Sequence, residues 1–151
     1  MNGHVHYGLT KRWAIEQGYD PAVAEVIAAA DIRVDREFPG RAWRNKRYHF
    51  AWLGARRIAR KWLAQAIGDG DPVLLGQALH CEQDAISHGQ LGHLIHWPGI
   101  DLWERRGPRV RARIEGATRA MLEEYLEATG GSAETPGKSS RASLGADRDI
   151  L

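Results

Sequence analysis

Hydrophobic residues recur at steps of three and four along most of the first 128 residues, which is the spacing of helices that bury one face. This pattern predicts five helices, at about 5–17, 21–37, 48–67, 72–89 and 107–128. Two of them should begin at Asp20-Pro21 and Asp71-Pro72, because aspartate caps a helix and proline suits its first turn. No segment shows the alternation of a strand, so we expect an all-α fold, a bundle of about five helices.

The segment 48–67 shows the clearest division between an apolar and a basic face. Its apolar positions follow helical spacing: Trp52, Ala55, Ile58, Ala59, Trp62, Leu63 and Ala66. Its basic positions lie on the other side: Arg56, Arg57, Arg60 and Lys61. A solvated helix face is the usual meaning of such a pattern, and contact with nucleic acid or a membrane surface is the less favoured alternative.

The composition suits one domain with its own core, since 43% of the 151 residues are hydrophobic and 26% are charged. We expect a single helical domain over 1–129. A disordered tail should follow over 130–151, where glycine, serine and charged residues replace large apolar ones. Lysine and arginine total 21 against 19 acidic residues, an excess too small to indicate a protein that binds polyanions.

A lone cysteine, Cys81, leaves no internal disulfide, and we expect it to be a small buried side chain without chemistry. No apolar run resembles a signal peptide or a transmembrane segment, so the expected location is cytoplasmic. Six tryptophans hint at an aromatic surface that is shared with a partner, for instance in a homo-oligomer.

The strongest chemical signal is the spacing of His80, Asp84 and His88 on an apolar helix. Residues four apart share one helix face, so the pattern places imidazole, carboxylate and imidazole in a stripe. A solvated polar face is the ordinary alternative, but the apolar neighbours of these residues favour burial. A buried carboxylate between histidines is costly without a cation, and this indicates a metal site.

Other segments supply further candidate ligands: His6, Asp31 and Asp35, His49, and His93. Each has an alternative, because a histidine near a chain start can be frayed and one in a core can simply be hydrogen-bonded. Together they favour a site with mixed nitrogen and oxygen ligands from several helices, as zinc prefers. The sequence therefore predicts a metal site in the core of the bundle.

With these residues placed, roughly residues 4–128 resemble the all-helical fold of zinc-dependent phospholipase C and single-strand-specific nucleases, especially small bacterial relatives. The resemblance lies in an ordered set: His6, Asp35, His49, His80 and Asp84. It implies that Asp84 bridges toward an ion held near the N-terminus, and that Asp35 bridges or orients a metal-bound water. His49 and His80 would complete the central site, and His88 or His93 would belong to the next metal position.

The resemblance makes a phosphoesterase the leading hypothesis, with two or three zinc ions and Asp35 as general base. Zinc lowers the pKa of a bound water to about 7, so hydroxide is available at neutral pH. Arg44 and Arg47 are candidates for binding a substrate phosphate. The alternatives are an iron- or zinc-dependent biosynthetic enzyme that is not a hydrolase, and a binding module with a structural metal. A small-molecule or phosphoester substrate is expected, and a nucleic acid is the less favoured partner.

Overall fold

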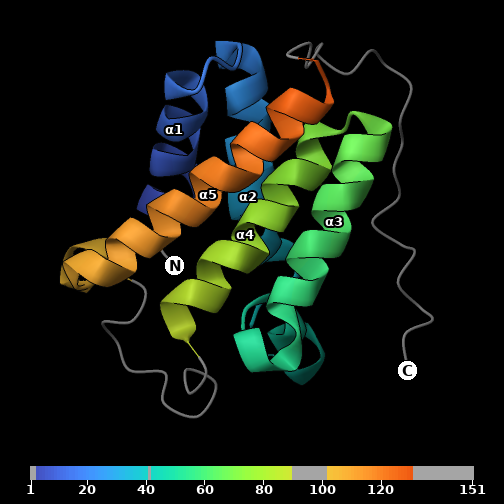
Figure 1. Cartoon of the computed structure of the whole chain (residues 1–151). Helices are drawn as coiled ribbons and strands as arrows, with labels where there is room; N and C mark the ends of the chain where they lie inside the picture. Colours follow the sequence, from blue (N-terminus) through green and yellow to red (C-terminus); the bar gives the residue numbers. More distant parts are fainter. Residues whose placement is uncertain (1–2, 41, 90–101, 131–151) are drawn as a thin grey trace.

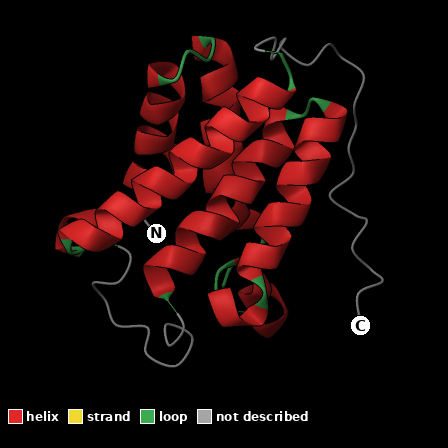
Figure 2. Ribbon diagram, in the orientation of Figure 1, coloured by secondary structure: helices red, strands yellow, loops and turns green. Residues whose placement is uncertain are grey.

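The computed structural model describes residues 3–40, 42–89 and 102–130, and over these ranges the fold is all-α (Figures 1 and 2). Five α-helices form its body: α1 (Thr10–Glu16), α2 (Pro21–Glu37), α3 (Ala55–Asp69), α4 (Pro72–His88) and α5 (Pro108–Ala128). The short helical turn η1 (His4–Leu9) precedes α1, and three more lie between later helices: η2 (Trp43–Tyr48), η3 (Ala51–Leu53) and η4 (Trp103–Arg105). The predicted all-α class and helix bundle are confirmed.

Helix α4 is the centre of the bundle. It packs against α2, α3 and α5, and Figure 1 shows it running between α3 and α5. Of its 17 residues 14 are buried, so its polar side chains must find partners inside the protein. Gly76 lets α2 approach closely, because a Cβ atom there would lie 2.2 Å from the carbonyl oxygen of Ile27.

The two Asp-Pro pairs begin helices as predicted. The Asp20 carboxylate accepts a hydrogen bond from the Ala22 amide at 2.8 Å, and the Asp71 carboxylate accepts one from the Val73 amide at 2.8 Å. Proline occupies the first turn of both helices, where its missing N–H costs nothing. These caps fix where α2 and α4 start, and so fix the register of the residues that α2 and α4 bring together.

The predicted helix at 48–67 is wrong in its first part. The α-helix begins only at Ala55, after two 3-10 turns and Gly54, whose φ of 104° belongs to the left-handed region. Glycine adopts this conformation without strain and thereby ends the preceding turn. Trp52 consequently leaves the predicted apolar face and is 53% exposed. His49 therefore comes from an irregular segment rather than from a helix.

The first predicted helix, 5–17, divides into the π-helical turn η1 and the α-helix α1. Cys81 is buried as predicted, and burial raises the pKa of its thiol well above the usual value, which keeps the thiol protonated. No helix in the described ranges is long and apolar enough to cross a membrane. The predicted tail lies outside the described residues from position 131 onward.

Candidate metal centre

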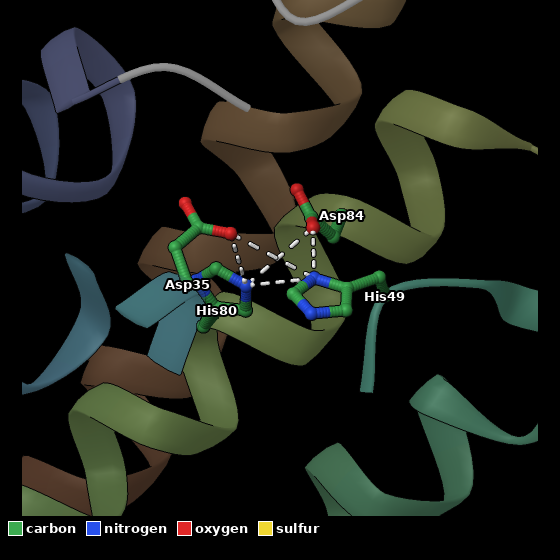
Figure 3. Close-up of side chains that lie close together, drawn as sticks. All are labelled: Asp35, His49, His80 and Asp84. Carbon is green, nitrogen blue, oxygen red and sulfur yellow. Dashed lines mark hydrogen bonds and ion pairs between the residues drawn. The ribbon is translucent and has the colours of Figure 1, made fainter. Parts of the chain in front are cut away.

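Four predicted ligands meet in the core of the bundle. Asp35 comes from the last turn of α2, His80 and Asp84 come from α4, and His49 comes from the segment between η2 and η3. Their side chains point toward one another (Figure 3), and one ligand atom from each lies within 4.8 Å of the others. Residues up to 49 positions apart in sequence thus present two nitrogen and two oxygen donors to a common point.

Three of the four donors are tightly grouped. His49 Nδ1 lies 2.7 Å from Asp84 Oδ2 and 3.2 Å from His80 Nε2. His80 Nε2 and Asp84 Oδ2 are 3.4 Å apart. Asp35 Oδ1 stands further away, at 3.6 Å from His80 Nε2 and 3.9 Å from His49 Nδ1. Ligands about 2.0–2.1 Å from a tetrahedral metal ion are separated by about 3.3 Å. The distances from His80 Nε2 to His49 Nδ1 and to Asp84 Oδ2 are close to this value, so the group could hold a metal ion.

The hydrogen bonds of His49 leave a place for a cation. Its Nε2–H donates to the carbonyl oxygen of Phe38 at 2.6 Å. A neutral imidazole carries one ring proton, so Nδ1 then presents a lone pair to the Asp84 carboxylate. Two electron pairs at this distance repel unless a positive charge lies between them, and either a second ring proton, donated from Nδ1 to Asp84, or a divalent ion can provide it. Gly40 keeps the ring in place, since a Cβ atom there would lie 3.1 Å from His49 Cδ2.

A proton on His80 can provide that charge when no metal is bound. Burial alone would lower the pKa of His80, but the carboxylates of Asp84, Asp31 and Asp35 around it raise the pKa to about 10. Burial would likewise raise the pKa of Asp84, yet nearby positive charge, including that of His88 and His80, holds this pKa well below its usual range. Because a metal ligand must be deprotonated, binding of an ion through His80 Nε2 would release a proton.

A second group lies on the other side of His80. Asp31 Oδ1 is 2.8 Å from His6 Nδ1 and 3.3 Å from His80 Nδ1, and all three side chains are fully buried. The His6 and His80 rings stack with their centroids 4.2 Å apart. These residues could also hold a metal ion. A neutral His80 has only one free ring lone pair, however, so it serves one of the two groups as a ligand.

Sequence reasoning missed Gln83, which precedes Asp84 and is buried beneath it. The Gln83 amide oxygen is 2.9 Å from His6 Nδ1, and its nitrogen donates to the hydroxyls of Thr10 at 2.9 Å and Thr118 at 3.2 Å. The available signal was an amide on an otherwise apolar helix face, because such a group must find partners when it is buried. The sequence gives no comparable indication that Thr10 or Thr118 belongs to the site.

Exposure divides the site into two sides. His6, Asp31 and His80 are fully buried, and His49 and Asp84 are nearly so. The side chain of Asp35 is 40% exposed, although it contacts the same cluster. Solvent therefore reaches Asp35, while the donors of His49, His80 and Asp84 are shielded from it.

The remaining predicted site residues are less closely tied to this cluster. His88 Nδ1 donates to the carbonyl oxygen of His49 at 3.1 Å, and it lies 3.9 Å from Asp84 Oδ2. Arg47 donates to the hydroxyl of Tyr48 at 2.8 Å, and Arg44 is exposed on η2. Their predicted roles stay predictions. His93 lies outside the described residues.

Comparisons with protein-family models, with curated proteins and with solved structures found no match to this chain. The site is therefore interpreted from its own geometry, which is that of buried His/Asp groups able to hold a metal ion.

Proposed function

We propose that this protein is a metal-dependent hydrolase, with zinc as its metal and a phosphoester as its substrate. The observation that carries the proposal is the convergence of His49 Nδ1, His80 Nε2 and Asp84 Oδ2 with a partly exposed carboxylate, Asp35, beside them. Two histidines and one carboxylate are a common ligand set of catalytic zinc, which keeps its fourth position for water or substrate.

In this proposal the three buried side chains hold the ion and Asp35 acts on the solvent side. Its greater distance from the two histidines and its exposure support a role as general base rather than as a fourth ligand. When bound, zinc would activate water for attack and withdraw charge from a phosphoryl oxygen. Asp35 would accept the proton of the attacking water, and the buried side chains packed around the histidines would keep them oriented.

The choice of phosphoester chemistry rests on the resemblance to zinc-dependent phospholipase C and single-strand-specific nucleases. The basic residues near His49 support it, because Arg44, Lys46 and Arg47 all belong to η2. Guanidinium groups bind phosphate oxygens through paired hydrogen bonds. Under this proposal η2 contributes the cations that attract the substrate.

A structural metal site is the second candidate function. The observation that favours it is that Asp35 is also close enough to act as a fourth ligand, which would leave no open position. Asp35→Asn separates the two candidates. A hydrolase would keep its zinc and lose its activity, whereas a structural site would lose both zinc affinity and thermal stability.

The proposal is tested by measuring the zinc content of the purified protein and its metal-dependent hydrolysis of bis(p-nitrophenyl) phosphate and p-nitrophenyl phosphate near neutral pH. We expect stoichiometric zinc and turnover of at least one substrate. His80→Ala and Asp84→Ala should lose the metal, while His4→Ala, which removes an exposed histidine, should keep it. Zinc retained by both site variants, or a zinc-loaded wild type that hydrolyses neither substrate, would contradict the proposal.

A further inference from the structure

The hydrogen bonds around Gln83 connect four helices beneath the candidate metal centre. Gln83 belongs to α4, Thr10 to α1, Thr118 to α5 and Asp31 to α2, and each of these side chains is at most 1% exposed. A buried amide that bonds to three side chains from other parts of the chain cannot turn or shift without leaving polar atoms unsatisfied. The network is therefore rigid.

The direction of each hydrogen bond in this network follows from the donors present. His6 Nδ1 lies between Asp31 Oδ1 at 2.8 Å and a Gln83 amide atom at 2.9 Å. A carboxylate oxygen only accepts, so Nδ1 must carry the ring proton, and the amide atom that faces it must be the oxygen. The Gln83 nitrogen then donates to the two threonine hydroxyls.

This arrangement determines what Thr10 does with its single proton. Its oxygen accepts from Gln83, and its proton has two acceptors: Asp31 Oδ2 at 2.9 Å and the Val5 carbonyl oxygen at 3.1 Å. The charged and nearer acceptor forms the stronger bond, so the proton goes to Asp31. Gln83 thus acts on the Asp31 carboxylate through Thr10, and that carboxylate faces His80 Nδ1 at 3.3 Å.

The second ring nitrogen of His6 points from this network toward Asp84. His6 Nε2 is buried without a hydrogen-bond partner and lies 3.3 Å from Asp84 Oδ1. With the proton on Nδ1, a neutral His6 presents the lone pair of Nε2 to this carboxylate. On the other ring, a His80 that releases its Nε2 proton to bind a metal keeps the proton on Nδ1, which faces Asp31, and presents the Nε2 lone pair toward Asp84 Oδ2. Both imidazoles then turn electron pairs toward Asp84.

We propose that Gln83 is a positioning residue that orients the His6 ring directly, and the His80 ring through Thr10 and Asp31. This inference rests on the proposed function in one respect, that His80 is a metal ligand. Outer hydrogen-bond partners of this kind fix the orientation and tautomer of metal-binding histidines, and removing them commonly lowers metal affinity about 10- to 100-fold. Gln83 would orient these histidine rings from the position that directly precedes Asp84 in the sequence.

The test is a measurement of the histidine ring protons by long-range ¹H–¹⁵N NMR on the full-length, ¹⁵N-histidine-labelled protein without metal. His6 should carry a proton on Nδ1, which faces Asp31 and Gln83. In Gln83→Met the Nδ1–H loses its amide acceptor but still faces Asp31 Oδ1 at 2.8 Å, so the proton should stay on Nδ1 and its ¹H resonance should shift from the wild-type position. Glu82→Gln is the matched control, because Glu82 lies on α4 but pairs with Arg56, 3.6 Å away.

Zinc titrations of the same proteins form the second arm. Gln83→Met should bind zinc about 10- to 100-fold more weakly than wild type, and Glu82→Gln should bind it equally well. If Gln83→Met does not fold, Thr10→Val and Thr10→Ser replace it, since serine keeps the hydroxyl that bonds to Asp31 and valine does not. Thr10→Val should weaken zinc binding by a similar factor, and Thr10→Ser should restore it.

The proposal is overturned if wild-type His6 carries no proton on Nδ1. It is also overturned if folded Gln83→Met keeps both the wild-type Nδ1–H resonance of His6 and the wild-type zinc affinity, or if Thr10→Val and Thr10→Ser bind zinc alike. A wild type that binds no zinc would instead end the proposed function, because the tautomer of His6 is measured without metal. Failure of the proposed role of Gln83 and failure of the proposed function are thus distinguishable.

Discussion

The two sides of the candidate metal centre are built differently. The inner side consists of His6, Asp31 and Gln83 with two threonine hydroxyls, all buried on helices or helical turns. The outer side consists of Asp35, which is 40% exposed, and His49, which lies in an irregular segment. Groups that hold an ion in place benefit from burial and complete hydrogen bonding, whereas a group that meets substrate needs access to solvent. Changes on the inner side should therefore affect stability and affinity, and changes at Asp35 should affect turnover.

Asp84 joins the two sides, so its replacement should have the largest effect. Its two carboxylate oxygens face His6 on one side and His49 and His80 on the other. Asp84→Asn would leave the positive charge on His80 poorly compensated, and losing one partner of a buried pair costs about 3–5 kcal/mol. We expect the metal-free variant to lose that much free energy of unfolding in chemical denaturation. A loss no larger than that of Glu82→Gln would contradict this role.

The proton on His80, which lies against Asp31 of the inner side, should also make stability depend on pH. The pKa of His80 is raised from 6.5 to about 10 in the folded protein, so the folded state binds this proton more tightly than the unfolded state. The resulting stability of the metal-free protein is fully present below pH 6.5 and is lost as the pH rises through about 10. Zinc affinity should change in the opposite direction, rising about tenfold per pH unit for one released proton.

Denaturation curves of the metal-free protein across this pH range, with parallel zinc titrations, measure both effects. A free energy of unfolding that did not fall between neutral pH and pH 10 would show that the carboxylates around His80 do not hold its proton. His80→Ala should abolish this part of the pH dependence.

On the outer side, Asp35→Asn should reduce turnover far more than it reduces metal binding. The amide cannot accept a proton from water, and loss of a general base costs about 10²- to 10⁴-fold in rate. We expect zinc affinity to change by less than about tenfold, because the buried donors of His49, His80 and Asp84 remain in place. Equal losses in affinity and rate would place Asp35 among the ligands instead.

The smallest effect on zinc binding should come from Gly40→Ala, which crowds the His49 ring without removing a metal donor. A methyl group 3.1 Å from His49 Cδ2 must displace the ring slightly, and such overpacking costs about 1–3 kcal/mol. Gly68→Ala is the matched control, because nothing lies within 4 Å of a Cβ atom at this position in α3. Gly40→Ala should weaken zinc binding measured by titration, and Gly68→Ala should not. Identical affinities would show that Gly40 does not position the ring.

The parts of this structure that are predictable from sequence depend on local periodicity and capping. Asp20 and Asp71 mark the starts of α2 and α4, and the four-residue step from His80 to Asp84 places both on one face. The start of α3 was not predictable from periodicity, because the apolar spacing runs through Gly54, whereas the left-handed backbone there ends the preceding turn. The spacing of Asp31 and Asp35 could not show that one is buried and the other exposed.

Gln83 shows a second limit of sequence reasoning. An amide in sequence carries no sign of which hydroxyls it will meet, and its partners Thr10 and Thr118 are 73 and 35 positions away. Metal donors are recognisable because few residue types bind metals, but the groups that orient them come from many types. The contacts that orient the donors therefore have to be taken from the fold.

The most direct test of the metal centre is a crystal of the zinc-loaded protein with anomalous data collected at the zinc edge. We expect an anomalous peak within bonding distance of His49 Nδ1, His80 Nε2 and Asp84 Oδ2, with His80 Nδ1 still facing Asp31. Zinc bound elsewhere, or no peak among these three atoms, would contradict it.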